Sequence, residues 1–138
     1  MRLTEQRRAA VVALYQHDVT GRPVDELFPA DARPYTRGLA HATLDFQDEL
    51  DEAIADHATG WSVDRIAPLE RAILRTATLE LLHPEVTTAD TPIPPEGAID
   101  EAVETAKAFC GADAPGFVNG ILGAVLRAVR ENGGAHAA

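Results

Sequence analysis

Cysteine and basic residues are scarce in this chain of 138 residues. Its single cysteine, Cys110, excludes an internal disulfide and a cysteine-based zinc site. Only 12 lysines and arginines stand against 22 acidic residues, which gives a formal net charge of −10. Strong nucleic-acid binding by a lone protein depends on many cations that neutralise phosphates, so this balance argues against it. An acidic surface suits a basic partner, although it also serves solubility by itself.

Long apolar runs are missing as well. No stretch of about 18 apolar residues is available to span a bilayer, and the N-terminus has no apolar signal-peptide core. These absences predict a soluble cytoplasmic protein with no membrane partner. Aromatic residues make up 5% of the chain, whereas apolar residues in total reach 46%. Because alanine, leucine and glutamate are frequent and β-branched runs are short, the composition predicts an all-α domain with one core.

Patterns typical of catalysis are also absent. The chain has no glycine-rich phosphate loop, no Gly-x-Ser-x-Gly elbow and no His-Glu-x-x-His. Its five histidines lie in different segments, without the spacing of metal ligands. Adjacent acidic residues such as Asp48 and Glu49 diverge by about 100° on a helix, so they do not converge on a substrate. We therefore expect no enzyme, no metal and no cofactor.

Helical spacing of apolar residues predicts five long helices and no strand. The expected helices cover residues 3–18, 34–58, 67–82, 99–110 and 114–130, with a short turn over 24–28 and a loop over 85–95. The core residues expected from these stripes include Leu14, Phe46, Ile73 and Ile121. Residues 1–131 would then form a single domain, and residues 132–138 a disordered tail.

Two helix starts carry residues suited to RNA. Arg2, Arg7 and Arg8 lie at the start of the first helix, either as phosphate contacts or as ordinary solvated arginines. Phe117 and Asn119 lie in the first turns of the last helix, although asparagine is a poor helix former. An exposed Phe117 ring can stack on an unpaired base, and Asn119 can bond to a base edge. Otherwise Phe117 belongs to the core. We predict that part of its ring stays exposed, because its neighbours already supply a core face.

Five short patterns follow one another in register along the chain. They are Arg7-x-x-Ala10-x-x-x-Leu14-Tyr15, Glu70-Arg71-Ala72-Ile73-Leu74-Arg75, Ala98-Ile99-x-Glu101-Ala102, Ala106-Lys107-x-Phe109 and Phe117-Val118-Asn119-Gly120. Each pattern alone is weak. Together, in this order and spacing, they resemble the NusB transcription antitermination family over nearly the whole chain. The resemblance implies a compact all-α bundle of two packed three-helix subdomains.

Members of that family bind the boxA sequence of nascent ribosomal RNA leaders together with NusE, a small-subunit ribosomal protein. The pair helps RNA polymerase to read through terminators. The resemblance therefore implies three partners: boxA-type single-stranded RNA, NusE and the RNA polymerase antitermination complex. The residues that it implies for RNA contact are Arg2, Arg7, Arg8, Asp113, Phe117 and Asn119, and those for NusE contact are Asp64, Glu70 and Arg75.

The N-terminus departs from the family pattern. Family members often carry a dense arginine cluster there, whereas Thr4 and Glu5 stand among the arginines of this chain. Fewer phosphate contacts predict weaker RNA binding by the chain alone and a greater dependence on its partner. The alternatives are a non-catalytic protein-interaction module and a homodimer that masks the RNA surface. A ribosomal RNA methyltransferase fragment is disfavoured, because the chain has no room for the cofactor domain and no catalytic cysteine motif.

Overall fold

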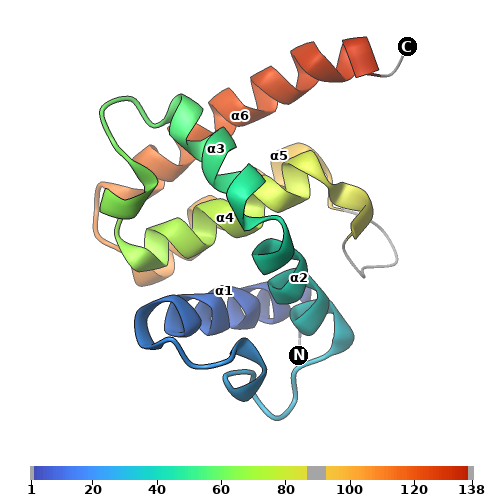
Figure 1. Cartoon of the computed structure of the whole chain (residues 1–138), viewed down its shortest axis with the longest axis vertical. Coiled ribbons are helices and arrows are strands. Elements are labelled where there is room, and N and C mark those ends of the chain that lie inside the picture. Colours follow the sequence, from blue (N-terminus) through green and yellow to red (C-terminus); the bar gives the residue numbers. More distant parts are fainter. Residues whose placement is uncertain (1, 87–92, 137–138) are drawn as a thin grey trace.

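The computed structural model describes residues 2–86 and 93–136, and within them the protein is entirely helical (Figure 1). The α-helices are α1 (Leu3–Thr20), α2 (Pro34–Asp45), α3 (Gln47–His57), α4 (Pro68–Leu82), α5 (Pro95–Phe109) and α6 (Ala114–His136). Three short 3₁₀ turns lie in the connections: η1 (Val24–Glu26), η2 (Val63–Arg65) and η3 (Pro84–Val86). The all-α prediction is confirmed. None of the described helices is long and apolar enough to cross a membrane.

Helix α4 lies at the centre of the bundle and packs against each of the other five α-helices. In Figure 1, α1 lies below α4, while α3 and α6 lie above it. An almost unbroken buried run makes this position possible, because every residue over 76–81 is buried and Leu74 is fully enclosed. Full burial of one leucine contributes about 1.5–3 kcal/mol. Of the two expected three-helix halves, α4–α6 pack on one another and α1 packs on α2, while α3 packs mainly on α4 and α6.

The core residues fall largely where helical spacing places them. Leu14, Ile73 and Ile121 are buried, as predicted. Phe46 is only half-buried and packs against the edge of the core. The apolar stripes of α1 and α6 therefore both face α4, which lies between them.

The single helix predicted over 34–58 is wrong, because the chain breaks at Phe46 into α2 and α3. Phe46 has φ −100° and ψ 11°, in the sparsely populated bridge region beside the α-helical one. Its ring stacks on His83, which follows α4, with ring centroids 4.3 Å apart. A contact between segments so distant in the sequence leaves no trace in the apolar periodicity of residues 34–58.

Two helix ends also differ from the prediction. Helix α6 continues to His136, so it passes the expected boundary between the domain and a tail over 132–138. The last two residues lie outside the described part of the chain. Helix α5 begins at Pro95 rather than at Ile99, and proline suits the first turn because it has no N–H to leave unpaired. The predicted loop over 85–95 begins inside η3, while residues 87–92 lie outside the described part.

Candidate functional site

The structure contradicts the surface position predicted for Arg7. Its side chain is only 5% exposed, and that of its partner Glu80 is 1% exposed. Arg7 donates two hydrogen bonds to this carboxylate, from Nη2 to Oε2 at 2.7 Å and from Nε to Oε1 at 3.3 Å. Nη2 also donates to the Tyr35 hydroxyl at 2.6 Å, and Nη1 lies 4.0 Å from Glu101. Arg7 therefore joins α1 to α2, α4 and α5 in the interior and is not available to RNA phosphates.

The surroundings of Arg7 and Tyr35 keep both side chains protonated at neutral pH. Burial lowers the pKa of the Arg7 guanidinium, but the hydrogen bonds and the charge of Glu80 outweigh burial and hold it above its ordinary value. Burial, followed by the charge of Glu80, raises the pKa of the Tyr35 phenol above its ordinary value. Tyr35 is therefore protonated at neutral pH and donates to Glu80 at 3.4 Å. The ion pair is enclosed and bidentate, and Tyr35 adds further hydrogen bonds to both partners, which favours a stable buried pair.

The other two N-terminal arginines keep part of their surface. Arg2 is exposed, and its backbone N–H donates to the Glu5 carboxylate at 3.1 Å at the start of α1. Arg8 is half-buried, and its guanidinium carbon lies 5.7 Å from the centre of the Phe109 ring. Phe109 ends α5 and is 48% exposed. Arg8 and Phe109 therefore form a cation–aromatic pair at the surface.

The predicted residues at the start of α6 border a cleft. Phe117 is half-buried, which confirms the predicted partial exposure of its ring, while Asp113 and Asn119 are exposed. Trp61 is 52% exposed and lies edge-on to Phe117, with ring centroids 6.2 Å apart and an interplanar angle of 69°. The cleft has a volume of about 330 Å³ and is lined by Trp61, Arg65, Ile66, Ala67, Glu70, Asp113, Ala114 and Phe117.

Trp61 and Arg65 were not predicted from the sequence. The available signal is that the only tryptophan of the chain falls between two predicted helices, outside every apolar stripe. A tryptophan without a place in the core is a candidate for a contact surface, because tryptophan is enriched in binding interfaces. The cleft also joins the two expected surfaces, because the resemblance implies RNA contact for Asp113 and Phe117 and NusE contact for Glu70.

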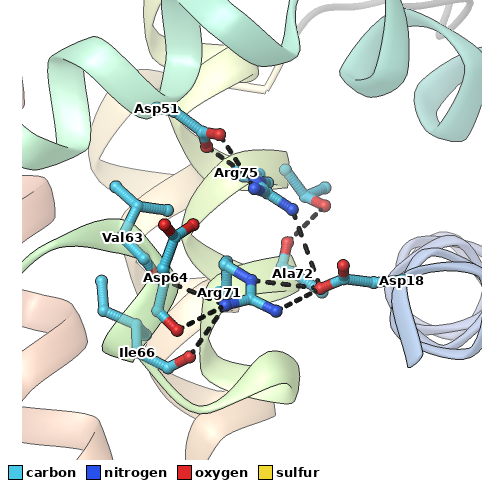
Figure 2. Close-up of polar contacts among 9 residues, drawn as sticks. Asp18, Asp51, Val63, Asp64, Ile66, Arg71, Ala72 and Arg75 are labelled. Carbon is cyan, nitrogen blue, oxygen red and sulfur yellow. Dashed lines mark hydrogen bonds and ion pairs between the residues drawn. The ribbon is translucent and has the colours of Figure 1, made fainter.

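An arginine on α4 fixes the connection that forms one wall of the cleft. Figure 2 shows Arg71 between α1 and η2, with its guanidinium pointing at both. It donates to Asp18 on α1 at 2.6 Å. Its Nη1 also donates to the backbone carbonyls of Val63, Asp64 and Ile66, at distances of 3.2 to 3.3 Å. These bonds tie η2 to the central helix, so the wall is part of the folded framework.

Arg75 is not free to contact a partner. Its Nε and Nη2 donate to the two carboxylate oxygens of Asp51 at 2.7 and 2.8 Å, and its Nη1 lies 3.9 Å from Asp18 (Figure 2). The side chain is therefore a structural link from α4 to α3 and α1. By contrast, the carboxylates of Asp64 and Glu70 have no hydrogen-bond or ion-pair partner within the described residues. Asp64 is exposed and Glu70 is half-buried.

The cleft shows no activated nucleophile. Burial raises the pKa of the nearby Cys110 thiol, and the negative charge of Glu70 raises it further. A thiol with a raised pKa is protonated at neutral pH and reacts slowly. Within residues 2–86 and 93–136, no three histidine, cysteine or acidic side chains gather in a way that would hold a metal ion.

Comparison with known proteins agrees with the motifs. The NusB family matches residues 4–127. The transcription antitermination protein NusB of Halalkalibacterium halodurans is 38% identical over 130 residues, which cover 90% of this chain and 92% of the relative. The structure of NusB from T. maritima superposes with a TM-score of 0.79, at 27% identity over 92% of each chain. A complex of the antitermination factors NusB and NusE with double-stranded RNA gives a TM-score of 0.76, at 27% identity over 91% of this chain and 96% of that chain. This chain belongs to the NusB family.

Proposed function

We propose that this protein is a transcription antitermination factor that binds boxA-type single-stranded RNA together with NusE and promotes read-through by RNA polymerase. The observation that carries the proposal is the family match over residues 4–127, joined to 38% identity with a transcription antitermination protein. A match of that length involves the whole bundle rather than one motif. The likeness to a NusB protein solved with NusE and RNA supports the two partners.

The charge of the chain supports joint binding with NusE. The formal net charge is −10, and the burial of Arg7 removes one of three N-terminal arginines from the surface. Each phosphate contact to a single strand contributes about 0.7 to the slope of log affinity against log salt. An acidic chain with so few accessible arginines at its N-terminus therefore binds RNA weakly by itself. A basic partner supplies the missing positive charge.

We place the RNA surface at Arg2, Arg8, Phe117 and Asn119, with Asp113 beside them. Arg2 and Arg8 would contact phosphates, Phe117 would stack on an unpaired base and Asn119 would bond to a base edge. The NusE surface would include the unpaired carboxylates of Asp64 and Glu70. Because neither binding role requires bond making or breaking, we also propose that the protein is not an enzyme. Its action on RNA polymerase would place it in the cytoplasm.

The test is an RNA titration followed by fluorescence anisotropy. A labelled boxA oligonucleotide and a scrambled one are titrated with the chain alone, with NusE alone and with both. We expect the pair to bind boxA much more tightly than either protein alone and to prefer it over the scramble. If the pair does not prefer boxA, the antitermination proposal is wrong.

Variants separate the two kinds of RNA contact. Arg2→Ala should weaken the binding of both RNAs and reduce the salt slope by about 0.7, because a phosphate contact carries no sequence information. Phe117→Ala should weaken binding without changing the slope, since stacking releases no counterions. Arg127→Ala is the matched control, because this exposed arginine lies about 15 Å beyond Phe117 along α6. If Arg2→Ala and Phe117→Ala bind like the Arg127 control, the proposed RNA surface is wrong.

A further inference from the structure

The cleft between Trp61 and Phe117 combines apolar walls with a charged rim. The ring of Trp61 is half-exposed, Ile66 and Ala67 add aliphatic surface, and Phe117 presents its ring at 69° to the indole. Exposed aromatic surface held in a fixed position is a common means of binding a ligand, and indole is the ring that attracts cations most strongly. Since Arg71 ties down η2, this binding surface exists before any ligand arrives.

The charged residues of the cleft carry an excess of negative charge. Glu70 and Asp113 provide two carboxylates and Arg65 provides one guanidinium. In the described part of the chain, none of these three side chains has a hydrogen bond or an ion pair. This contrasts with Arg71 and Arg75, which are both paired with carboxylates. A half-buried carboxylate such as Glu70 has lost part of its hydration, and a nearby cation would stabilise its charge.

The same charges disfavour RNA inside the cleft, although a base can still stack on Phe117 at its edge. A nucleobase brings its phosphate to the rim, where it would meet two carboxylates and only one arginine on a chain of net charge −10. A basic side chain is stabilised by the apolar walls, by the indole ring and by the negative rim. Its alkyl stem covers apolar surface, its head lies over the indole and its charge pairs with Glu70. Arginine fits better than lysine, because its guanidinium is planar and more weakly hydrated.

We propose that the cleft lined by Trp61, Glu70, Asp113 and Phe117 receives an arginine or lysine side chain of a protein partner, with the cation over the indole and paired to Glu70. The choice of NusE as the partner in the test rests on the proposed function. The site thereby lies at the border between the protein partner and the RNA. Trp61 and Phe117 act as its aromatic walls, and an unpaired base is the competing occupant.

The single tryptophan makes the cleft directly observable. Chain labelled with 5-fluorotryptophan gives one ¹⁹F resonance, which reports Trp61 even when a partner contains tryptophan of its own. Purified NusE and a single-stranded boxA oligonucleotide are added separately, and the formation of each complex is followed independently by size-exclusion chromatography and anisotropy. We expect NusE to shift the resonance, and RNA alone to shift it by less, because a base that stacks on Phe117 at the edge of the cleft does not enter it. A shift with RNA alone and none with NusE would identify a base as the occupant and overturn the proposal.

Two variants test the energetics. Glu70→Gln and Trp61→Ala should each weaken NusE binding by about tenfold, in line with the loss of a partly desolvated cation contact. Glu131→Gln is the matched control, because Glu131 is an exposed acid about 27 Å from Asp113 along α6. Circular dichroism verifies that Trp61→Ala folds, and Glu70→Gln provides the test if it does not.

The outcomes distinguish this proposal from the proposed function. If wild-type chain binds NusE but the resonance does not move, and Glu70→Gln binds like Glu131→Gln, only the cleft assignment is wrong. If wild-type chain and NusE form no complex at all, both the cleft assignment and the proposed function are wrong. A loss of NusE binding in Glu70→Gln at low salt that disappears at high salt identifies the contact as ionic, as expected.

Discussion

Replacement of Arg7 by methionine tests whether this arginine stabilises the fold or contacts RNA. Methionine keeps much of the length of the side chain and removes the guanidinium. Glu80 would then remain 1% exposed without its cation, and Tyr35 would lose the donor 2.6 Å from its hydroxyl. The variant therefore leaves a charge enclosed in the core instead of freeing a surface site.

The expected loss follows from that enclosed charge. Removal of one partner of a buried ion pair costs about 3–5 kcal/mol, because the desolvated partner stays unpaired. A domain of this size unfolds with a free energy of about 5–15 kcal/mol, so the change consumes a large part of the total. With a urea dependence of about 2 kcal/mol per molar, the unfolding midpoint should fall by about 2 M.

Urea unfolding followed by circular dichroism at 25 °C measures this shift. Arg8→Met is the matched control, because Arg8 is the next residue on α1 and keeps part of its surface exposed. The control should lose far less stability. The double variant Arg7→Met with Glu80→Gln should recover part of the loss, since it removes the enclosed charge. A midpoint of Arg7→Met equal to that of Arg8→Met, together with a smaller RNA salt slope, would refute the structural role and restore the RNA contact.

Further predictions concern the core, an exposed ion pair and the cysteine. Leu14→Ala and Ile121→Ala should each cost about 2–5 kcal/mol in urea unfolding, and a loss below about 0.5 kcal/mol would mean that the buried stripes are misassigned. The hydrogen bond from Arg130 lowers the pKa of Glu96. The pair therefore stabilises the fold at pH values above the unfolded-state pKa of Glu96, and this stabilisation is lost as the pH falls through the folded-state pKa. Arg130→Ala should raise the folded-state pKa of Glu96 in an NMR titration. Cys110 should react slowly with a thiol reagent at neutral pH, because its pKa is raised, and a rate equal to that of free cysteine would contradict this.

The sequence contains the information that Arg7 is buried, although its position near the N-terminus suggests a surface role. Arg7 precedes Ala10, Val11 and Leu14 at intervals of three, four and seven residues, which puts it on the buried stripe of α1. Glu80 likewise lies on a buried face of α4. Opposite charges on two core-facing stripes predict a buried pair. Which two helices face each other is a tertiary property, and the periodicity of one segment does not determine it.

The division between α2 and α3 is likewise not determined by the pattern of one segment. The apolar positions over 34–58 continue in helical register across Phe46, so a local reading gives one helix. At the break the ring of Phe46 stacks on His83, which lies far along the chain beyond α4. Phe46 has bridge-region backbone angles there, and α3 begins at the next residue. Local propensity decides that these residues are helical, whereas a distant contact decides how many helices they form.

The cleft is the feature least accessible to local reasoning, because three separate segments build it. Trp61 and Arg65 come from the connection around η2, Glu70 from the first turn of α4, and Asp113 with Phe117 from the start of α6. Motif resemblance divides Glu70, Asp113 and Phe117 between a NusE surface and an RNA surface, and it leaves out Trp61 and Arg65, since it treats each segment separately. The fold brings them within one cavity of about 330 Å³, where a single ligand must satisfy them together. The chemistry of that ligand therefore follows from their summed charge and aromatic surface, and both favour a cation.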